Sequence, residues 1–261
     1  MTLFLHEMKR NLKALIIWTL VIGFILAVCV FVYPEMRGQM NEMTDMFASM
    51  GSFTSAFGLD ELNFGEFMGY FGIECGNTLG LGGVLFAAIL GITALSKEEK
   101  EKTAEFLLTH PVSRKSILTS KLFSVITQIF ILNICITAIV LPTALTIGED
   151  VDVKALVLLF LAYFILQIEV GCITFGISAY LRGGSIMLGI GIGLLMYFIN
   201  LVANLVSSLE ILKFFTPFSY ADGAYIINNG GYEWKYILTG AVMMAVSLVL
   251  GFVKYNRKDI A

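Results

Sequence analysis

The chain has 261 residues, of which 57% are hydrophobic and 14% are charged, and its mean hydropathy is +0.84. Soluble domains carry about 25% charged residues, so this composition excludes an ordinary soluble protein. The formal net charge of -3 argues against nucleic acid as a partner, because nucleic-acid-binding domains carry an excess of basic residues.

Six long segments with at most one charged residue each predict membrane spans. A spanning helix needs roughly 20 apolar residues to cross about 30 Å of hydrocarbon. The predicted fold is therefore an all-α integral membrane protein, with one transmembrane domain over residues 1–261. The spans are expected at about 14–34, 73–96, 122–147, 155–180, 185–207 and 236–253.

The first apolar run follows a basic segment, as in a secretory signal. It is long enough to span, however, and it lacks a small-x-small cleavage site. We therefore expect a retained first span that ends at Tyr33-Pro34-Glu35.

The distribution of lysine and arginine predicts the orientation. With the N-terminus inside, 13 of the 17 basic residues fall on the inner side and 12 of the 20 acidic residues on the outer side. The positive-inside rule then places both termini in the cytoplasm, with an inner loop at 97–121 and outer loops at 35–72 and 208–235. We expect a multi-pass protein of a bacterial cytoplasmic membrane.

The first outer loop contains five methionines at helical spacing. One face of a helix would carry them, which predicts an amphipathic helix on the membrane surface or on neighbouring spans. A soft thioether site for Cu(I) is the alternative. The methionines are Met36, Met40, Met43, Met46 and Met50.

The inner loop is predicted to form a short amphipathic helix, a break at Pro111, and a second helix with Ser113 as its N-cap. This shape suits docking on a cytosolic partner. A solvated charged turn that only sets the topology is the alternative.

Small and polar residues mark several spans. Glycines 72, 76 and 80 in the second span, and a stripe at Gly189, Gly193, Tyr197, Asn200 and Asn204 in the fifth, permit close helix packing. Glu169 lies near the middle of its span, where a carboxylate is either functional or bonded between helices. The four cysteines fall in four separate spans, and packing explains them better than a disulfide or a metal site.

The inner loop carries a run of residues with a recognisable pattern: Thr103, Glu105, Leu107, Leu108, Pro111, Val112, Ser113, Arg114, Ile117 and Lys121. This run resembles the loop between spans two and three of ABC-2 type transporter permeases, the six-span subunits of type V-like ATP-binding cassette exporters. This chain has Lys102 where that family often has a glycine. Residues 215–220, Phe-Thr-Pro-Phe-Ser-Tyr, are similar to a turn after the fifth span in the same family.

The resemblance implies a permease that works as a homodimer or with a close paralogue, surrounded by membrane lipids. It also implies a separate ATPase subunit that binds ATP and Mg, since this chain has no Gly-Lys pair and hence no phosphate-binding loop. Basic and apolar residues before the first span predict an N-terminal amphipathic helix on the inner surface. The expected ATPase contacts are Glu101, Thr103, Glu105, Leu107, Leu108, Pro111 and Arg114, and the expected substrate-pathway residues are Asn77, Glu169, Tyr197, Asn200 and Asn204.

No catalytic constellation or cofactor site is evident, so we expect a permease that is not itself an enzyme. The leading hypothesis is export of a hydrophobic or amphipathic molecule, with a peptide toxin or antimicrobial as the first choice. Three alternatives remain: a membrane sensor or assembly protein without transport, an ion or copper-related transporter, and a proton-coupled carrier that uses Glu169.

Overall fold

A computed structural model describes residues 2–49, 54, 62–100, 113–183 and 185–258. Within these residues all regular structure is helical, and six segments are long and apolar enough to cross a membrane. The predicted all-helical fold with six spans is confirmed. The spanning elements are α1 (Thr2–Ser49), a stack of α3 (Phe67–Cys75), η1 (Gly76–Leu81) and α4 (Gly82–Lys100), then α6 (Arg114–Thr146), α7 (Val153–Ser178), α8 (Ile186–Leu205) and α10 (Trp234–Arg257).

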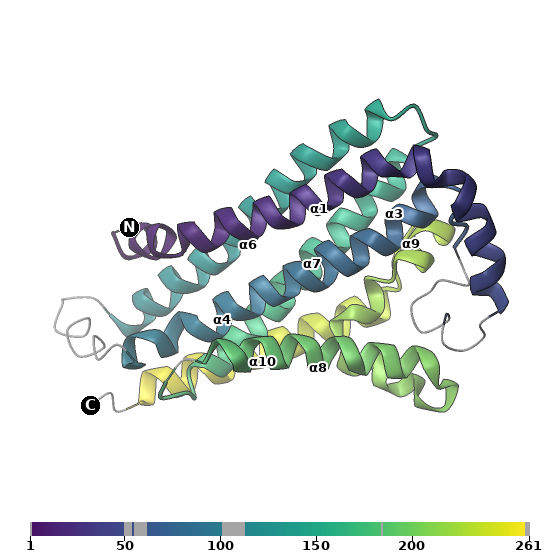
Figure 1. Cartoon of the computed structure of the whole chain (residues 1–261). Helices are drawn as coiled ribbons and strands as arrows, with labels where there is room; N and C mark the ends of the chain where they lie inside the picture. Colours follow the sequence, from purple (N-terminus) through teal and green to yellow (C-terminus); the bar gives the residue numbers. More distant parts are fainter. Residues whose placement is uncertain (1, 50–53, 55–61, 101–112, 184, 259–261) are drawn as a thin grey trace.

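The helices pack in three layers (Figure 1). The α3–η1–α4 stack and α7 form the middle layer, α1 pairs with α6 on one side, and α8 and α10 cover the other side. The outward faces of the outer helices are apolar, as shown by Phe24, Met187 and Leu238, which are 71%, 76% and 67% exposed. Such faces suit contact with lipid tails or with another membrane subunit.

The chain starts and finishes at the same end of the bundle, where α1 begins and α10 ends (Figure 1). We call this the terminal end. α4 also finishes here and α6 begins here, so the described flanks of the inner loop lie at the terminal end.

Helix α1 passes through Pro34, where the sequence predicted the end of the first span, without a break. It continues to Ser49, and Figure 1 shows the ribbon bending in its last third. Proline lacks an N–H and removes one helical hydrogen bond to the residue four positions earlier, which bends a helix without necessarily ending it. Next to the bend, the buried Tyr33 hydroxyl donates to the Gly65 carbonyl at 2.7 Å and fixes α1 against the start of the second span.

The helical methionine segment predicted after Pro34 forms as the last part of α1. Met40 is buried and Met36 is half-buried against the core, whereas Met46 is 50% exposed. The side chains of Met43 and Met50 lie outside the described part of the chain.

Glycines permit the close approach of the second span to α7. A methyl group on Gly80 would lie 3.1 Å from the Tyr163 ring, and one on Gly91 would lie 2.9 Å from the Phe175 backbone nitrogen. Gly80, one of the glycines predicted to permit close packing, therefore does so, and Gly91 adds a second close contact between the second span and α7.

Short helices connect α8 to α10. They are η2 (Ser207–Phe215), η3 (Pro217–Tyr220) and α9 (Gly223–Asn229). Residues Pro217–Tyr220 are buried, so η3 packs among the spans, whereas most of η2 is exposed. Gly230 ends α9 with φ 62°, a conformation that glycine adopts without strain.

Candidate functional site

A polar cavity of about 90 Å³ lies where the second span meets α8, η3 and α9. Four of the five predicted pathway residues line it: Asn77 from η1, and Tyr197, Asn200 and Asn204 from α8. The spacing of the three α8 residues places them on one helix face, and the packing of α8 on the second span brings Asn77 to the same cavity.

The cavity walls combine fixed and unpaired polar groups. Ser219 donates its hydroxyl to Asn200 Oδ1 at 3.1 Å, and the Tyr197 ring packs edge-on against Phe218 with ring centres 5.5 Å apart. Among the described residues, the side-chain amides of Asn77 and Asn204 have no protein hydrogen-bond partner. Each amide offers two donors and one acceptor oxygen, so the cavity has free capacity for a polar ligand or for water.

An unusual helical turn presents Asn77. Residues 76–81 form a π-helix between α3 and α4, and Asn77 is exposed although it lies in a spanning segment. Single π-turns inside helices occur often at functional sites, because the wider turn changes the direction of one side chain. Neither the π-turn nor its effect on Asn77 was evident in the spacing of the sequence.

Glu169 does not reach this cavity. It is 2% exposed, and its Oε2 accepts a hydrogen bond from the buried Tyr220 hydroxyl at 2.8 Å. Gly240 of α10 lies against the same carboxylate so closely that any larger residue there would collide with it. The structure thus places Glu169 as a link between α7, η3 and α10, apart from the other predicted pathway residues.

Most of the predicted ATPase contacts lie outside the described residues, namely Glu101, Thr103, Glu105, Leu107, Leu108 and Pro111. The flank that follows them is described. The predicted N-cap is confirmed, because Ser113 Oγ accepts from the Ser116 backbone N–H at 3.2 Å.

Arg114, the seventh predicted contact, turns toward the last turn of α10. One guanidinium nitrogen donates to the carbonyls of Tyr255 at 3.1 Å, Asn256 at 3.3 Å and Lys258 at 2.7 Å. A cation at a helix C-terminus satisfies carbonyls that lack helical partners and complements the helix dipole. Arg114 therefore joins the start of α6 to the end of α10.

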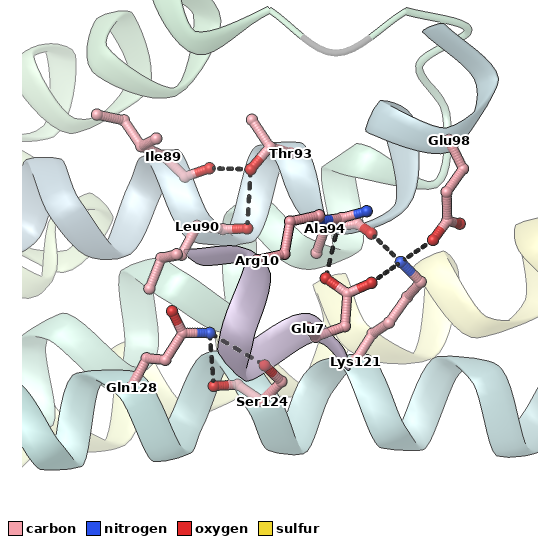
Figure 2. Close-up of polar contacts among 10 residues, drawn as sticks. All are labelled: Glu7, Arg10, Ile89, Leu90, Thr93, Ala94, Glu98, Lys121, Ser124 and Gln128. Carbon is pink, nitrogen blue, oxygen red and sulfur yellow. Dashed lines mark hydrogen bonds and ion pairs between the residues drawn. The ribbon is translucent and has the colours of Figure 1, made fainter. Parts of the chain in front are cut away.

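A buried charge cluster at the terminal end was missed by the sequence analysis. Lys121 of α6 is 1% exposed and reaches Glu7 of α1 at 2.9 Å, Glu98 of α4, and the Ala94 carbonyl at 2.8 Å (Figure 2). Arg10 completes the cluster with a 2.7 Å ion pair to Glu7. The available signal was Lys121 itself, since a lysine at the mouth of a span must find an acidic partner if it is buried.

Within the described residues, no group of three histidine, cysteine or acidic side chains is placed to hold a metal ion. The four cysteines are free thiols, and Cys75 and Cys172 are buried in the helix packing.

In the part of the chain that the structure describes, six helices can span a membrane, a cavity lined by polar side chains lies between the second span and α8, and a charge cluster lies at the terminal end. These features define a multi-pass membrane protein with a polar interior site. The family model for the ABC-2 family transporter protein matches residues 1–260. The chain belongs to this family and is the membrane permease component of an ATP-binding cassette transporter. Membership implies an ATP-binding cassette ATPase as partner in general terms. Comparison with curated proteins finds no significant match.

Proposed function

We propose that this permease exports an amphipathic peptide through a path shared by two copies of the chain, driven by a separate ATPase that binds ATP and Mg. In this proposal the terminal end faces the cytoplasm of a bacterial cell. The excess of basic residues on that side favours this orientation. The ATPase docks at the terminal end, on the inner loop.

The cavity residues carry the proposal. Peptide groups present N–H donors and carbonyl acceptors, and side-chain amides such as those of Asn77 and Asn204 pair with both. The Tyr197 and Phe218 rings add an apolar wall beside the amides. A site of this mixed character suits a molecule with polar and apolar faces.

The small volume of the cavity indicates that the transport path is closed in this arrangement of the helices. A volume of about 90 Å³ holds a few water molecules, whereas ligand sites usually measure roughly 300–1,000 Å³. Transport therefore requires the second span and α8 to separate or to meet a second copy across a wider space.

The exposure of Asn77 supports a second copy. Asn77 is exposed in a spanning segment, and the part of its amide that the cavity does not shelter would be unfavourable in lipid, because hydrocarbon offers it no hydrogen bond. Contact with a second copy, or with a water-filled path between copies, removes that cost. The neighbouring apolar face of α8, with Leu195 60% and Phe198 56% exposed, supplies surface for the same contact.

The test is ATP-dependent uptake of a fluorescent cationic amphipathic peptide into inside-out vesicles that contain the permease and its ATPase. Asn77→Ala and Asn200→Ala should each slow uptake about 2- to 10-fold, the effect of losing one ordinary hydrogen bond. Asn229→Ala is the matched control, because Asn229 is exposed and bonds only within α9, to the Tyr225 carbonyl.

Several outcomes would contradict the proposal. Unchanged uptake in both cavity variants would remove the peptide path from this cavity. A purified complex that hydrolyses ATP without moving the peptide would favour another substrate. A chain that binds no ATPase would favour a sensor or assembly role.

A further inference from the structure

The charge cluster at the terminal end connects three helices that lie far apart in the sequence. Lys121 is on α6, Glu98 on α4 and Glu7 on α1, and the three side chains are 1%, 9% and 4% exposed. Glu98 lies near the start of the inner loop at 97–121, and Lys121 is its last residue. One ammonium group therefore joins both flanks of that loop to each other and to the first turns of the chain.

The contacts of Lys121 saturate its ammonium group. Its three N–H donors have three acceptors, on Glu7, Glu98 and the Ala94 carbonyl (Figure 2). Glu7 in turn uses its second oxygen to bind Arg10, one turn further along α1. A pair of buried charges with good geometry resists separation, because pulling one charge away leaves the other unpaired in a low-dielectric environment.

Polar groups continue from this cluster into the bundle. On α6, Gln128 donates to the carbonyl and the hydroxyl of Ser124, which lies one turn from Lys121 (Figure 2). Among the described residues, Gln128 Oε1 and Arg10 Nε are buried without hydrogen-bond partners. The α1–α4–α6 contact thus keeps unused hydrogen-bonding capacity beside the charge cluster.

Arg114 makes the corresponding connection at the other end of the chain. It lies in the second half of the inner loop, directly after Ser113, and holds the last turn of α10 through three carbonyls. The described flanks of the inner loop are thereby bonded to both the first and the last helix.

We propose that Glu7 and Lys121 are positioning residues that transmit displacement of the inner loop to α1, so that ATPase action on the loop moves the first span together with α4 and α6. This inference rests on the proposed function, because it requires an ATPase that acts on the loop. It assigns a role in coupling to the N-terminal turns of α1, for which the sequence predicted only an amphipathic helix on the inner surface.

The sharpest variant is Glu7→Gln. It removes the charge that connects Lys121 to α1 but leaves Lys121 paired with Glu98, so the two flanks of the loop stay joined. The matched control is Glu149→Gln, which breaks the 3.0 Å ion pair with Arg37 at the opposite end of the bundle. Both substitutions remove one carboxylate charge and keep the side-chain shape.

The measured quantity is the number of peptides transported per ATP hydrolysed by the full complex in vesicles. Glu7→Gln should assemble normally and hydrolyse ATP, while peptides per ATP fall about fivefold or more, as expected for loss of a coupling interaction. Glu149→Gln should keep the wild-type ratio. The exchange Glu7→Lys with Lys121→Glu should recover part of the ratio that Lys121→Glu alone loses, because positions 7 and 121 again carry opposite charges. Like-charge contacts with Glu98 and Arg10 keep the recovery below the wild-type ratio.

A second measurement covers the case in which Lys121→Glu fails to fold. Spin labels at Leu12→Cys on α1 and Lys115→Cys on α6, both exposed positions, are placed in a chain whose four natural cysteines are replaced. ATP binding to the complex should leave the distance between the two spin labels unchanged in the wild type, because α1 and α6 move together. In Glu7→Gln, ATP binding should change this distance.

The results separate two kinds of failure. A wild-type complex that hydrolyses ATP without moving peptide contradicts the proposed substrate, and the spin-label distances still test the coupling role. A wild-type ratio in Glu7→Gln with unchanged distances overturns the coupling role alone. Parallel loss of assembly, ATP hydrolysis and transport in Glu7→Gln also overturns it, because that pattern marks a purely structural pair. A chain that binds no ATPase overturns both.

Discussion

Gly91 offers the most direct test of the central packing between α4 and α7. Its α-carbon faces the backbone of α7, and a methyl group there would lie 2.9 Å from the Phe175 nitrogen and closer still to the Gly171 carbonyl oxygen. Backbone atoms cannot rotate away as a flexible side chain can. Gly91→Ala must therefore push the two helices apart.

The expected cost is about 1–3 kcal/mol, the range for forcing one extra carbon into a packed interior. At about 2–4 °C per kcal/mol for a chain of this size, the melting temperature should fall by about 2–12 °C. Thermal unfolding of the purified permease in detergent measures this shift. Gly38→Ala is the control, because nothing lies within 4 Å of a methyl group at that exposed helical position of α1.

The control should unfold at or slightly above the wild-type temperature, since alanine favours helix over glycine by about 0.5–1 kcal/mol. If Gly91→Ala is as stable as Gly38→Ala, the two middle helices are not in the contact described here. The interpretation that glycines in the second span permit its close packing against α7 would then be wrong.

Two further predictions concern the links between helices. Glu169→Ala should destabilise the permease by about 1–3 kcal/mol, because the buried Tyr220 hydroxyl loses its acceptor, whereas Glu169→Gln keeps an acceptor oxygen and should lose less in thermal unfolding. If Glu169→Gln assembles normally but transports less, the carboxylate charge has a role beyond this hydrogen bond; unchanged transport restricts Glu169 to packing. Arg114→Gln should speed amide hydrogen exchange in the last turn of α10 about 2- to 30-fold, the effect of losing about 0.3–2 kcal/mol at a helix C-terminus. Exchange at the wild-type rate would show that Arg114 does not hold that turn.

Local patterns were sufficient to predict much of the fold. Hydropathy identified six spans, because a spanning helix must be apolar over a fixed length whatever its neighbours are. The N-cap at Ser113 and the glycine contacts also followed from spacing along one helix. A helix beyond Pro34 was predicted from the methionine spacing, but its continuity with the first span was not, because a proline that bends a helix and one that ends it leave the same sequence signal.

The site was less accessible from the sequence. The α8 stripe gave Tyr197, Asn200 and Asn204 one face, but the resemblance to a family, rather than spacing, added Asn77. The pairing of Glu7 with Lys121 spans 114 positions. The spacing of residues along one helix cannot predict this pairing, because the pairing depends on the register in which α1 packs against α6.

The central claim is that this permease moves its substrate only when a separate ATPase drives it. Peptide uptake should be measured in liposomes that contain the permease alone, the permease with its ATPase, and the same complex without ATP. The account predicts uptake only with permease, ATPase and ATP together. Equal uptake by the permease alone would contradict it and would indicate a carrier driven by an ion gradient.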